Sequence, residues 1–367
     1  MKIAFWITTN KYFDPAKLDD TPFGGCEIEA FNVGKALAKT YGEKVLVFAN
    51  VSERHNSESF VFFQYGDLVD ALERNNVDAF VVVRADDRIL SPRRSALYLT
   101  QIKPQRVILW SGDSYDQPNN ELMHDTMTLN RIDKIILKGQ WQKETWLKAF
   151  SYINAGKVAV IRKGLNTEWL STERSQAIAP KFVYASTAFR GLSKFHEIWP
   201  IIKTGIPQAT LDCYCKVSLY ADNKLNIEYE KLYESIGNLV GVTIKEPLPQ
   251  KDFLQELPQY YAMLYPNTFE ETVCGVALEA MASGVPIITT KSAGLIETVR
   301  DGGGILIDEK PNSKEYDRKF VDQVIALWNN GGLREDLSMR GFNNIRDKYA
   351  IEKISHDWQN VLGELFS

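Results

Sequence analysis

Two glutamates in one short stretch have the types and the spacing to bind a sugar and a phosphate together. Glu271 and Glu279 stand eight positions apart within residues 266–297, PNTFEETVCGVALEAMASGVPIITTKSAGLIE. The run ALEAMASG predicts a helix that ends at Gly284, so Glu271 lies in the loop before this helix and Glu279 a turn or more inside it. An anion would face the backbone N–H groups at the helix start, which belong to Thr272, Val273, Cys274 and Gly275.

A glycine pair near the N-terminus is a second candidate for an anion site. Gly24 and Gly25, in TPFGGCEIEA, come just before a predicted helix over residues 27–40. Glycine lets the backbone approach a ligand closely, and a helix N-terminus favours negative charge. The pair lacks the GxGxxG spacing of a dinucleotide site, and a plain turn before a helix is the alternative interpretation.

The elements that position these residues alternate between short apolar strands and amphipathic helices, in two blocks. Buried parallel strands are predicted at residues 2–8, 44–50, 79–84, 106–110, 132–137 and 157–161, and again at 181–186, 209–215, 242–246, 262–266, 285–290 and 303–308. Two such blocks predict two doubly wound, Rossmann-like sheets. Ligands bind beyond the carboxyl ends of the strands in these sheets, so two facing sheets would form a deep cleft.

The domain boundary is expected in a polar segment, residues 163–180, that ends with Pro180. We predict a first domain over residues 1–165 and a second over 166–348. A C-terminal helix over 349–367 completes the chain. A length of 367 residues fits two domains of ordinary size.

The glutamate pair and the run LEAMASGVPII resemble the Glu-x7-Glu motif of retaining GT-B glycosyltransferases of the family-4 type, the glycosyl transferases group 1. The glycine pair and KGLN, residues 163–166, are similar to turns at the same places in that family. The resemblance implies an α/β fold of the GT-B type, with an N-terminal acceptor-binding domain and a C-terminal donor-binding domain. It also implies a last helix that crosses back to the first domain, where we expect Trp358 and Leu362 to pack.

The same resemblance assigns roles to individual residues. Glu271 would bind sugar hydroxyls and stabilise the ring cation, Glu279 would bind the ribose hydroxyls, and Gly24 and Gly25 would face the donor phosphates and the acceptor. Base contacts are expected from residues 242–249.

Two positions depart from the family pattern. The family places Gly-Arg and then Lys-Gly on the diphosphate, whereas this chain has Ala185-Ser186 and then Arg190-Gly191. Arg190 is therefore the main residue expected at the leaving group, with Lys194 as a nearby substitute for the missing cation. After the strand at 106–110 the family often has His-Asp, and here Gly112 precedes Asp113. Asp113 would contact the acceptor or the sugar, or would simply cap a loop.

Composition and sequence patterns limit the classes of partner and the cellular location that we expect for this protein. A net charge of −4 gives no general attraction to nucleic acid. No apolar run approaches the ~20 residues of a membrane span, the N-terminus lacks the pattern of a signal peptide, and the cysteines show no zinc or CxxC spacing. We expect a cytoplasmic protein. The helix at 140–150, with tryptophans and lysines, could make weak peripheral membrane contact, although a core-facing helix is the preferred interpretation.

These observations predict a metal-independent enzyme without a cofactor that moves a sugar from a nucleoside-diphosphate donor to a glycan, lipid-linked or protein-glycan acceptor. The alternative is a non-catalytic scaffold that binds a sugar nucleotide, which the missing cation and histidine keep open. Adjacent aspartates in RADDR, residues 84–88, could instead bind a metal, but no GT-A pattern surrounds them.

Overall fold

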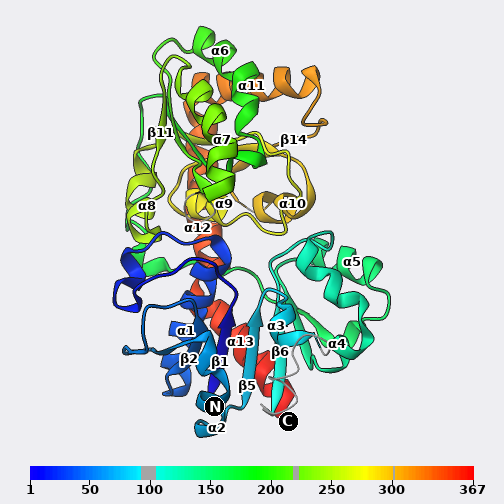
Figure 1. Ribbon diagram of the computed structural model, residues 1–367. Helices are drawn as coiled ribbons and strands as arrows, with labels where there is room; N and C mark the ends of the chain where they lie inside the picture. Colours follow the sequence, from blue (N-terminus) through cyan, green and yellow to red (C-terminus); the bar gives the residue numbers. More distant parts are fainter. Residues whose placement is uncertain (92–104, 218–222, 301) are drawn as a thin grey trace. The chain divides into compact units, whose positions relative to one another are not determined.

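The computed structural model describes residues 1–91, 105–217, 223–300 and 302–367, and these residues form two compact units (Figure 1). The first unit comprises Met1–Gly164 and Ile351–Ser367, and the second comprises Leu165–Ala350. The chain therefore leaves the first unit once and returns to it at its end. The predicted α/β class with two parallel-sheet domains is confirmed.

The described part of the first unit contains an eight-stranded sheet with the strand order β3-β4-β2-β1-β5-β6-β7-β8. Neighbouring strands are parallel except β3 and β4, which are antiparallel. The strands are β1 (Ile3–Ile7), β2 (Val45–Ala49), β3 (His55–Asn56), β4 (Phe60–Gln64), β5 (Ala79–Val83), β6 (Arg106–Trp110), β7 (Lys134–Leu137) and β8 (Val158–Val160).

Helices cover both faces of this sheet, which explains why its strands are apolar throughout. Successive side chains of β1 alternate between two cores: Phe5 packs on the side of α1 (Gly25–Tyr41) and α13 (Ile351–Phe366), and Trp6 on the opposite side. The helices of that opposite side are α2 (Leu68–Arg74), α3 (Asp87–Leu90), α4 (Thr126–Asn130) and α5 (Gln140–Ala149).

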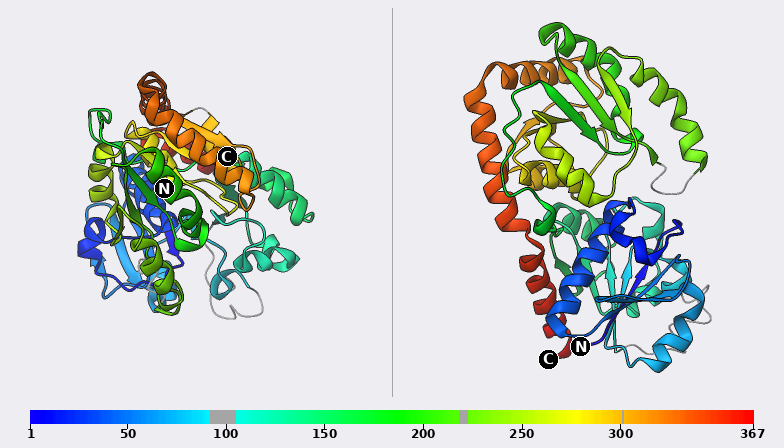
Figure 2. Two further views of the ribbon diagram at one scale, coloured as in Figure 1. Left: turned by 90° about the horizontal axis from the view of Figure 1, so that it is seen from above. Right: turned by 90° about the vertical axis from the view of Figure 1, so that its left-hand side faces the viewer.

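The C-terminal helix α13 is part of the first unit's core. It lies beside α1 (Figure 2), and Trp358 and Leu362 are fully buried, as expected from the sequence. The ring of Trp358 meets the ring of Trp110 edge to face, with 4.7 Å between the centroids. The helix α13 therefore completes the hydrophobic core between α1 and the sheet of the first unit.

The described part of the second unit contains a six-stranded, fully parallel sheet with the order β11-β10-β9-β12-β13-β14. Its strands are β9 (Lys181–Ala185), β10 (Thr210–Tyr214), β11 (Val242–Lys245), β12 (Ala262–Tyr265), β13 (Ile287–Thr290) and β14 (Gly304–Ile307). Its helices are α6 (Phe195–Gly205), α7 (Asn223–Gly237), α8 (Gln250–Glu256), α9 (Gly275–Ala282), α10 (Ala293–Arg300), α11 (Lys314–Asn329) and α12 (Gly331–Tyr349). The sequence analysis predicted neither α12 nor the strand β4.

Short 3-10 helices lie in the connections of both units. They are η1 (Pro15–Asp20), η2 (Tyr65–Asp67), η3 (Pro118–His124), η4 (Ala155–Lys157), η5 (Thr167–Trp169), η6 (Ala188–Arg190), η7 (Leu192–Lys194) and η9 (Leu257–Gln259).

Each sheet has a point where the strand order reverses. In the first unit the chain builds outward from β1 to β2 and β4 and then continues on the other side with β5, and in the second unit the same reversal separates β9 from β12. At such a point the loops after the two central strands diverge and leave room for a ligand. The functional side chains are therefore expected in the loops after β1 and β5, and after β9 and β12.

Candidate active site

In the second unit, an arginine and a glutamate from the two strands beside the reversal form an ion pair. Arg190 ends η6, which follows β9, and Glu271 lies in the loop after β12. Nη1 of Arg190 donates to both carboxylate oxygens of Glu271, at 2.9 and 3.1 Å. Glu271 is only 4% exposed, so its carboxylate is shielded from water, whereas the side chain of Arg190 is 27% exposed. The residues predicted separately for the diphosphate and for the sugar are thus in direct contact.

A glycine allows these two loops to approach each other. Gly191 has φ +120°, and a Cβ atom there would lie 2.1 Å from the carbonyl oxygen of Pro266. No side chain fits at this distance, and the backbone conformation is one that other residues rarely adopt. The glycine that follows Arg190 is therefore required to bring the arginine next to Glu271.

A tyrosine that the sequence analysis did not single out holds the glutamate from its other side. Tyr265 is the last residue of β12, and its Oη donates to Oε1 of Glu271 at 2.5 Å. Ser186, at the place where the family resemblance led us to expect a cation, lies 3.3 Å from the same Oη. Burial raises the pKa of the Tyr265 phenol well above its usual range, so the phenol keeps its proton and donates it.

The start of α9 has the character of an anion site. The helix begins at Gly275, and its N-cap residue Cys274 makes no side-chain capping bond. Burial raises the pKa of the Cys274 thiol, so this side chain stays neutral and adds no negative charge there. Thr272 and Cys274 are buried, whereas Val273 and Gly275 are half-buried.

The second glycine turn, SAG, supports the loop that carries Glu271. The N–H of Gly294 donates to the backbone carbonyl of Glu271 at 2.8 Å. A Cβ atom at Gly294 would lie 2.0 Å from the carbonyl oxygen of Thr272, so only glycine allows this approach. The loop is therefore fixed by its backbone as well as by its side chains.

Glu279 lies farther along α9 and has a different partner. It is 6% exposed, and its Oε1 accepts a hydrogen bond from Nε2 of Gln250 at 2.6 Å. Gln250 opens α8, directly after the loop that was predicted to contact the base. The glutamate is thus positioned next to that loop, and its contact with ribose stays a prediction.

Lys194 forms an ion pair of its own. Its Nζ lies 2.6 Å from Oδ1 of Asp317 on α11, and both side chains are mostly buried. A phosphate contact would require Lys194 to share its charge with this carboxylate. The predicted role as a substitute cation stays untested.

The predicted residues of the first unit gather at the N-terminus of α1 and the end of β6. Gly24 is the N-cap of α1, and the carbonyl of Gly25 accepts a hydrogen bond from Nζ of Lys163 at 2.9 Å. Asp113 accepts from Nε of Arg84 at 2.9 Å through Oδ2. Its backbone carbonyl accepts from Nε1 of Trp146, so Asp113 is held by its side chain and by its backbone, and its role toward a ligand stays a prediction.

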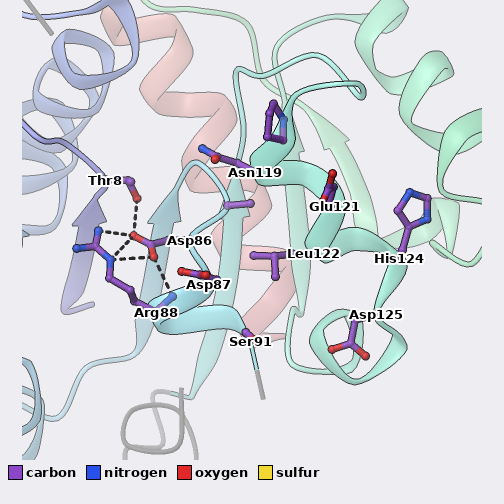
Figure 3. Close-up of a pocket in the computed structure, with 12 residues that line it drawn as sticks. Thr8, Asp86, Asp87, Arg88, Ser91, Asn119, Glu121, Leu122, His124 and Asp125 are labelled. Atoms are coloured by element: carbon purple, nitrogen blue, oxygen red, sulfur yellow. Dashed lines mark hydrogen bonds and ion pairs between the residues drawn. The ribbon is translucent and has the colours of Figure 1, made fainter. Parts of the chain in front are cut away.

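A cavity of about 710 Å³ opens in the first unit between the loop after β5 and η3 (Figure 3). Asp86 forms one wall, and it accepts hydrogen bonds from Trp6, Thr8 and Arg88 at 2.8, 3.1 and 2.6 Å. Both adjacent aspartates line the cavity, and the carboxylate of Asp86 is held in place by these donors. A volume of this size would hold a sugar unit.

The helix α5 faces the core with its large side chains. The sequence analysis considered contact between this helix and a membrane surface. Trp146 and Phe150 are instead buried in the core of the first unit. Within the described ranges, no helix combines the length and the apolar character that crossing a bilayer requires.

Comparisons with known proteins were made for the sequence and for the fold. The model of the family Glycosyl transferases group 1 matches residues 220–343. An uncharacterised glycosyltransferase of Methanocaldococcus jannaschii is 25% identical over 252 residues, which are 65% of this chain and 68% of that protein.

Solved structures resemble the whole chain. HepE of Anabaena in complex with UDP-glucose has a TM-score of 0.74 at 14% identity, with 99% of this chain and all of that chain covered. Sucrose-phosphate synthase of Thermosynechococcus elongatus has a TM-score of 0.71 at 16% identity and covers all of this chain and 99% of its own. At these identities the likeness concerns the fold.

Proposed function

Since the chain belongs to the group 1 glycosyltransferases, as its Glu-x7-Glu motif predicted, we propose that it is a retaining, metal-independent enzyme that transfers a sugar from a nucleoside-diphosphate donor to a glycan or glycolipid acceptor. The predicted GT-B fold is confirmed as well. Retention, the donor, the acceptor and the absence of a metal are parts of the proposal.

The contact between Arg190 and Glu271 carries this proposal. As the bond between the anomeric carbon and the diphosphate breaks, negative charge grows on the leaving phosphate and positive charge on the sugar ring. A guanidinium and a carboxylate side by side would stabilise these two charges at once. Tyr265 fixes the carboxylate by a 2.5 Å hydrogen bond, so the groups are in place before the donor binds.

The same arrangement supports the proposal of metal independence. Arg190 and the backbone N–H groups at the start of α9 would supply positive charge where other glycosyltransferases use a cation. Lys194 would add a further positive charge if its ammonium group contacted the phosphate as well as Asp317.

The retaining course needs no protein nucleophile. The acceptor oxygen bonds to the anomeric carbon on the face that the diphosphate leaves, and the diphosphate departs with the electron pair of the broken bond. A phosphate oxygen takes the proton of the acceptor hydroxyl. Asp113 stays a candidate for contact with the acceptor or the sugar from the first unit.

We propose a uridine nucleotide as the donor carrier. The similar HepE structure contains UDP-glucose, and Glu279 with Gln250 borders the segment 242–249 that we expect to contact the base. Nucleotide sugars of this kind and four unpaired cysteines fit a cytoplasmic location.

Calorimetry with UDP-glucose, UDP-galactose and UDP-N-acetylglucosamine tests the proposal, with and without EDTA. We expect one donor to bind with equal affinity in both conditions, and the anomeric proton of the product, seen by NMR, to keep the donor's configuration. Loss of turnover in EDTA that magnesium restores would refute metal independence. An inverted product would refute retention.

A further inference from the structure

The charged side chains at the N-terminus of α1 form a cluster that the proposed chemistry has not used. Six ionisable groups lie at the carboxyl end of the first unit's sheet: Glu27, Glu29, Arg84, Asp113, Lys138 and Lys163. They come from α1 and from the ends of β5, β6, β7 and β8. Their formal charges cancel, with three cations and three carboxylates.

Most of these groups are bound by one another. Nζ of Lys138 lies 2.7 Å from Oε1 of Glu29, and both side chains are buried. Nζ of Lys163 donates to the carbonyl of Gly25, and Asp113 accepts from Nε of Arg84. Satisfied pairs of this kind build a rigid frame and bind no ligand themselves.

Glu27 differs from this frame. It lies in the first turn of α1 and is 7% exposed, yet its carboxylate has no side-chain partner among the residues that the structure describes. Burial raises the pKa of this carboxyl, whereas a hydrogen bond from its own backbone N–H and the positive charges of Arg84 and Lys163 lower it. A buried carboxylate whose hydrogen bond comes only from its own backbone N–H is incompletely compensated and weakens a fold, so its presence points to a ligand.

Arg84 is also only partly used. Its side chain is 29% exposed and bonds to Asp113 through Nε, while Nη1 and Nη2 find no partner in the described ranges. Its backbone adopts φ +66°, which is uncommon for arginine, and its N–H still pairs with the carbonyl of Trp110. The strained backbone and Asp113 together aim an open guanidinium at the edge of the sheet.

A side chain at the usual histidine position would disturb this arrangement. A Cβ atom at Gly112 would lie 3.2 Å from Sγ of Cys26 and 3.6 Å from Cε of Lys138. A side chain here would therefore sit tightly against Cys26 of α1 and in contact with Lys138 at the end of β7. Arg84, from the neighbouring strand, supplies a partly exposed donor at this edge.

We propose that Glu27 and Arg84 together bind a ring of a neutral acceptor sugar, with Glu27 accepting from one hydroxyl and the terminal nitrogens of Arg84 donating to another. A sugar hydroxyl both donates and accepts, so it satisfies a carboxylate and a guanidinium side by side. A phosphate or carboxylate ligand would be repelled by the negative charge of Glu27. The inference rests on the proposed function, because it assigns the acceptor of the same reaction.

The arrangement also bears on the glycine pair. Gly24 and Gly25 precede Glu27 by two or three residues, so a ligand that approaches their backbone also meets this carboxylate. The acceptor sugar is then a better ligand for the glycines than the donor phosphates.

Saturation-transfer NMR on the full chain tests this site without relying on turnover. The probes are methyl glucoside, methyl galactoside, methyl mannoside and methyl N-acetylglucosaminide, each with UDP present, and glucose 6-phosphate as the anionic counterpart. We expect at least one neutral glycoside to bind, and Glu27→Gln and Arg84→Lys to weaken its affinity at least about tenfold. The exposed residues Glu43 and Arg74 provide matched controls, as Glu43→Gln and Arg74→Lys.

Three results would overturn the assignment: no neutral glycoside binds, glucose 6-phosphate binds better than the glycosides, or both site variants bind like the wild type. Calorimetry with UDP-glucose on the same proteins separates glycoside binding at Glu27 and Arg84 from binding of the nucleotide-sugar donor. We expect both variants to keep the donor affinity of the wild type, and a loss as large as that for the glycoside would make the pair a donor or folding element. A wild type that binds glycoside but no nucleotide sugar would refute the proposed function instead.

Discussion

Each sheet carries an arginine–carboxylate pair beyond the carboxyl ends of its strands, after β5 and β6 in the first unit and after β9 and β12 in the second, and the pairs differ in what they leave open. In the second unit, Glu271 receives both Arg190 and Tyr265, so its carboxylate is satisfied before any ligand arrives. In the first unit, Arg84 holds Asp113 through one nitrogen and Glu27 has no side-chain partner among the described residues. A satisfied pair suits a site where charge develops during the reaction, and an open pair suits a site that recognises hydroxyls.

The comparison also shows how each site is fixed. Gly191 and Gly294 permit backbone approaches in the second unit that no other residue would allow. The first unit relies instead on buried ion pairs, such as the one between Lys138 and Glu29. The proposed donor site therefore depends on close backbone approaches as well as on charged side chains, whereas the proposed acceptor site depends mainly on charged side chains.

The largest effect should come from removing the charge at the centre of the second site. Glu271→Gln is expected to lower the rate of sugar transfer about a thousandfold, because the ring cation loses its carboxylate. Steady-state kinetics with the melting temperature as a fold check would measure this. Glu270→Gln, at the exposed neighbouring position, should keep nearly wild-type rates. Equal rates for both variants would remove Glu271 from the site.

Arg190→Ala tests whether the paired arginine also binds the donor. We expect the affinity for the nucleoside diphosphate to fall about 10- to 100-fold, since a charge-assisted contact to phosphate is lost. Titration calorimetry with UDP gives the value directly. An unchanged affinity would mean that Arg190 serves Glu271 alone.

Tyr265→Phe sharpens the claim that the second site is organised in advance. Loss of one hydrogen bond to a charged group should lower kcat about tenfold with little change in the donor KM. Tyr261→Phe is the matched control, because its hydroxyl bonds to the carbonyl of Leu327. A similar loss of kcat in both variants would indicate a general effect on the fold.

The smallest expected effect is on the stability of the folded protein, and it tests the first unit's site through the buried carboxyl of Glu27. Burial raises the pKa of Glu27 above its ordinary value of 4.5, so the folded state binds this proton more tightly than the unfolded state. Stability then falls as the pH rises above that value. Glu27→Gln should therefore raise the melting temperature at pH 7 and flatten its dependence on pH. Identical melting curves from pH 4 to 8 would contradict the burial of an unpaired charge.

Much of the fold could be predicted because buried parallel strands are short apolar runs. β6 was predicted at its observed bounds, and β1 and β2 within one residue of theirs. The strand β4 was missed because it follows β3 and not a helix, which breaks the alternation. The helix α12 was missed because it begins with two glycines and has few apolar residues, and it packs partly through Gly341.

The sequence predicted those site residues that belong to a continuous motif. It did not predict contacts between residues that are far apart in the chain. The spacing of Glu271 and Glu279 identified the loop and helix of the second unit. The hydrogen bond from Tyr265 depends on how β12 ends, and the pairing of Arg190 depends on an 81-residue separation in the chain. Glu27 gave no signal, because a glutamate in the first turn of a helix usually faces solvent and favours the helix dipole.

The placement of α13 has a consequence for synthesis on the ribosome. Residues 1–164 emerge first, but the apolar face that receives Trp358 and Leu362 stays uncovered until the whole second unit has been translated. At typical elongation rates this delay is on the order of 10 to 40 seconds. Nascent chains should therefore present a hydrophobic surface to chaperones during this interval, and translation that stops before Ile351 should yield a first half that cannot mature.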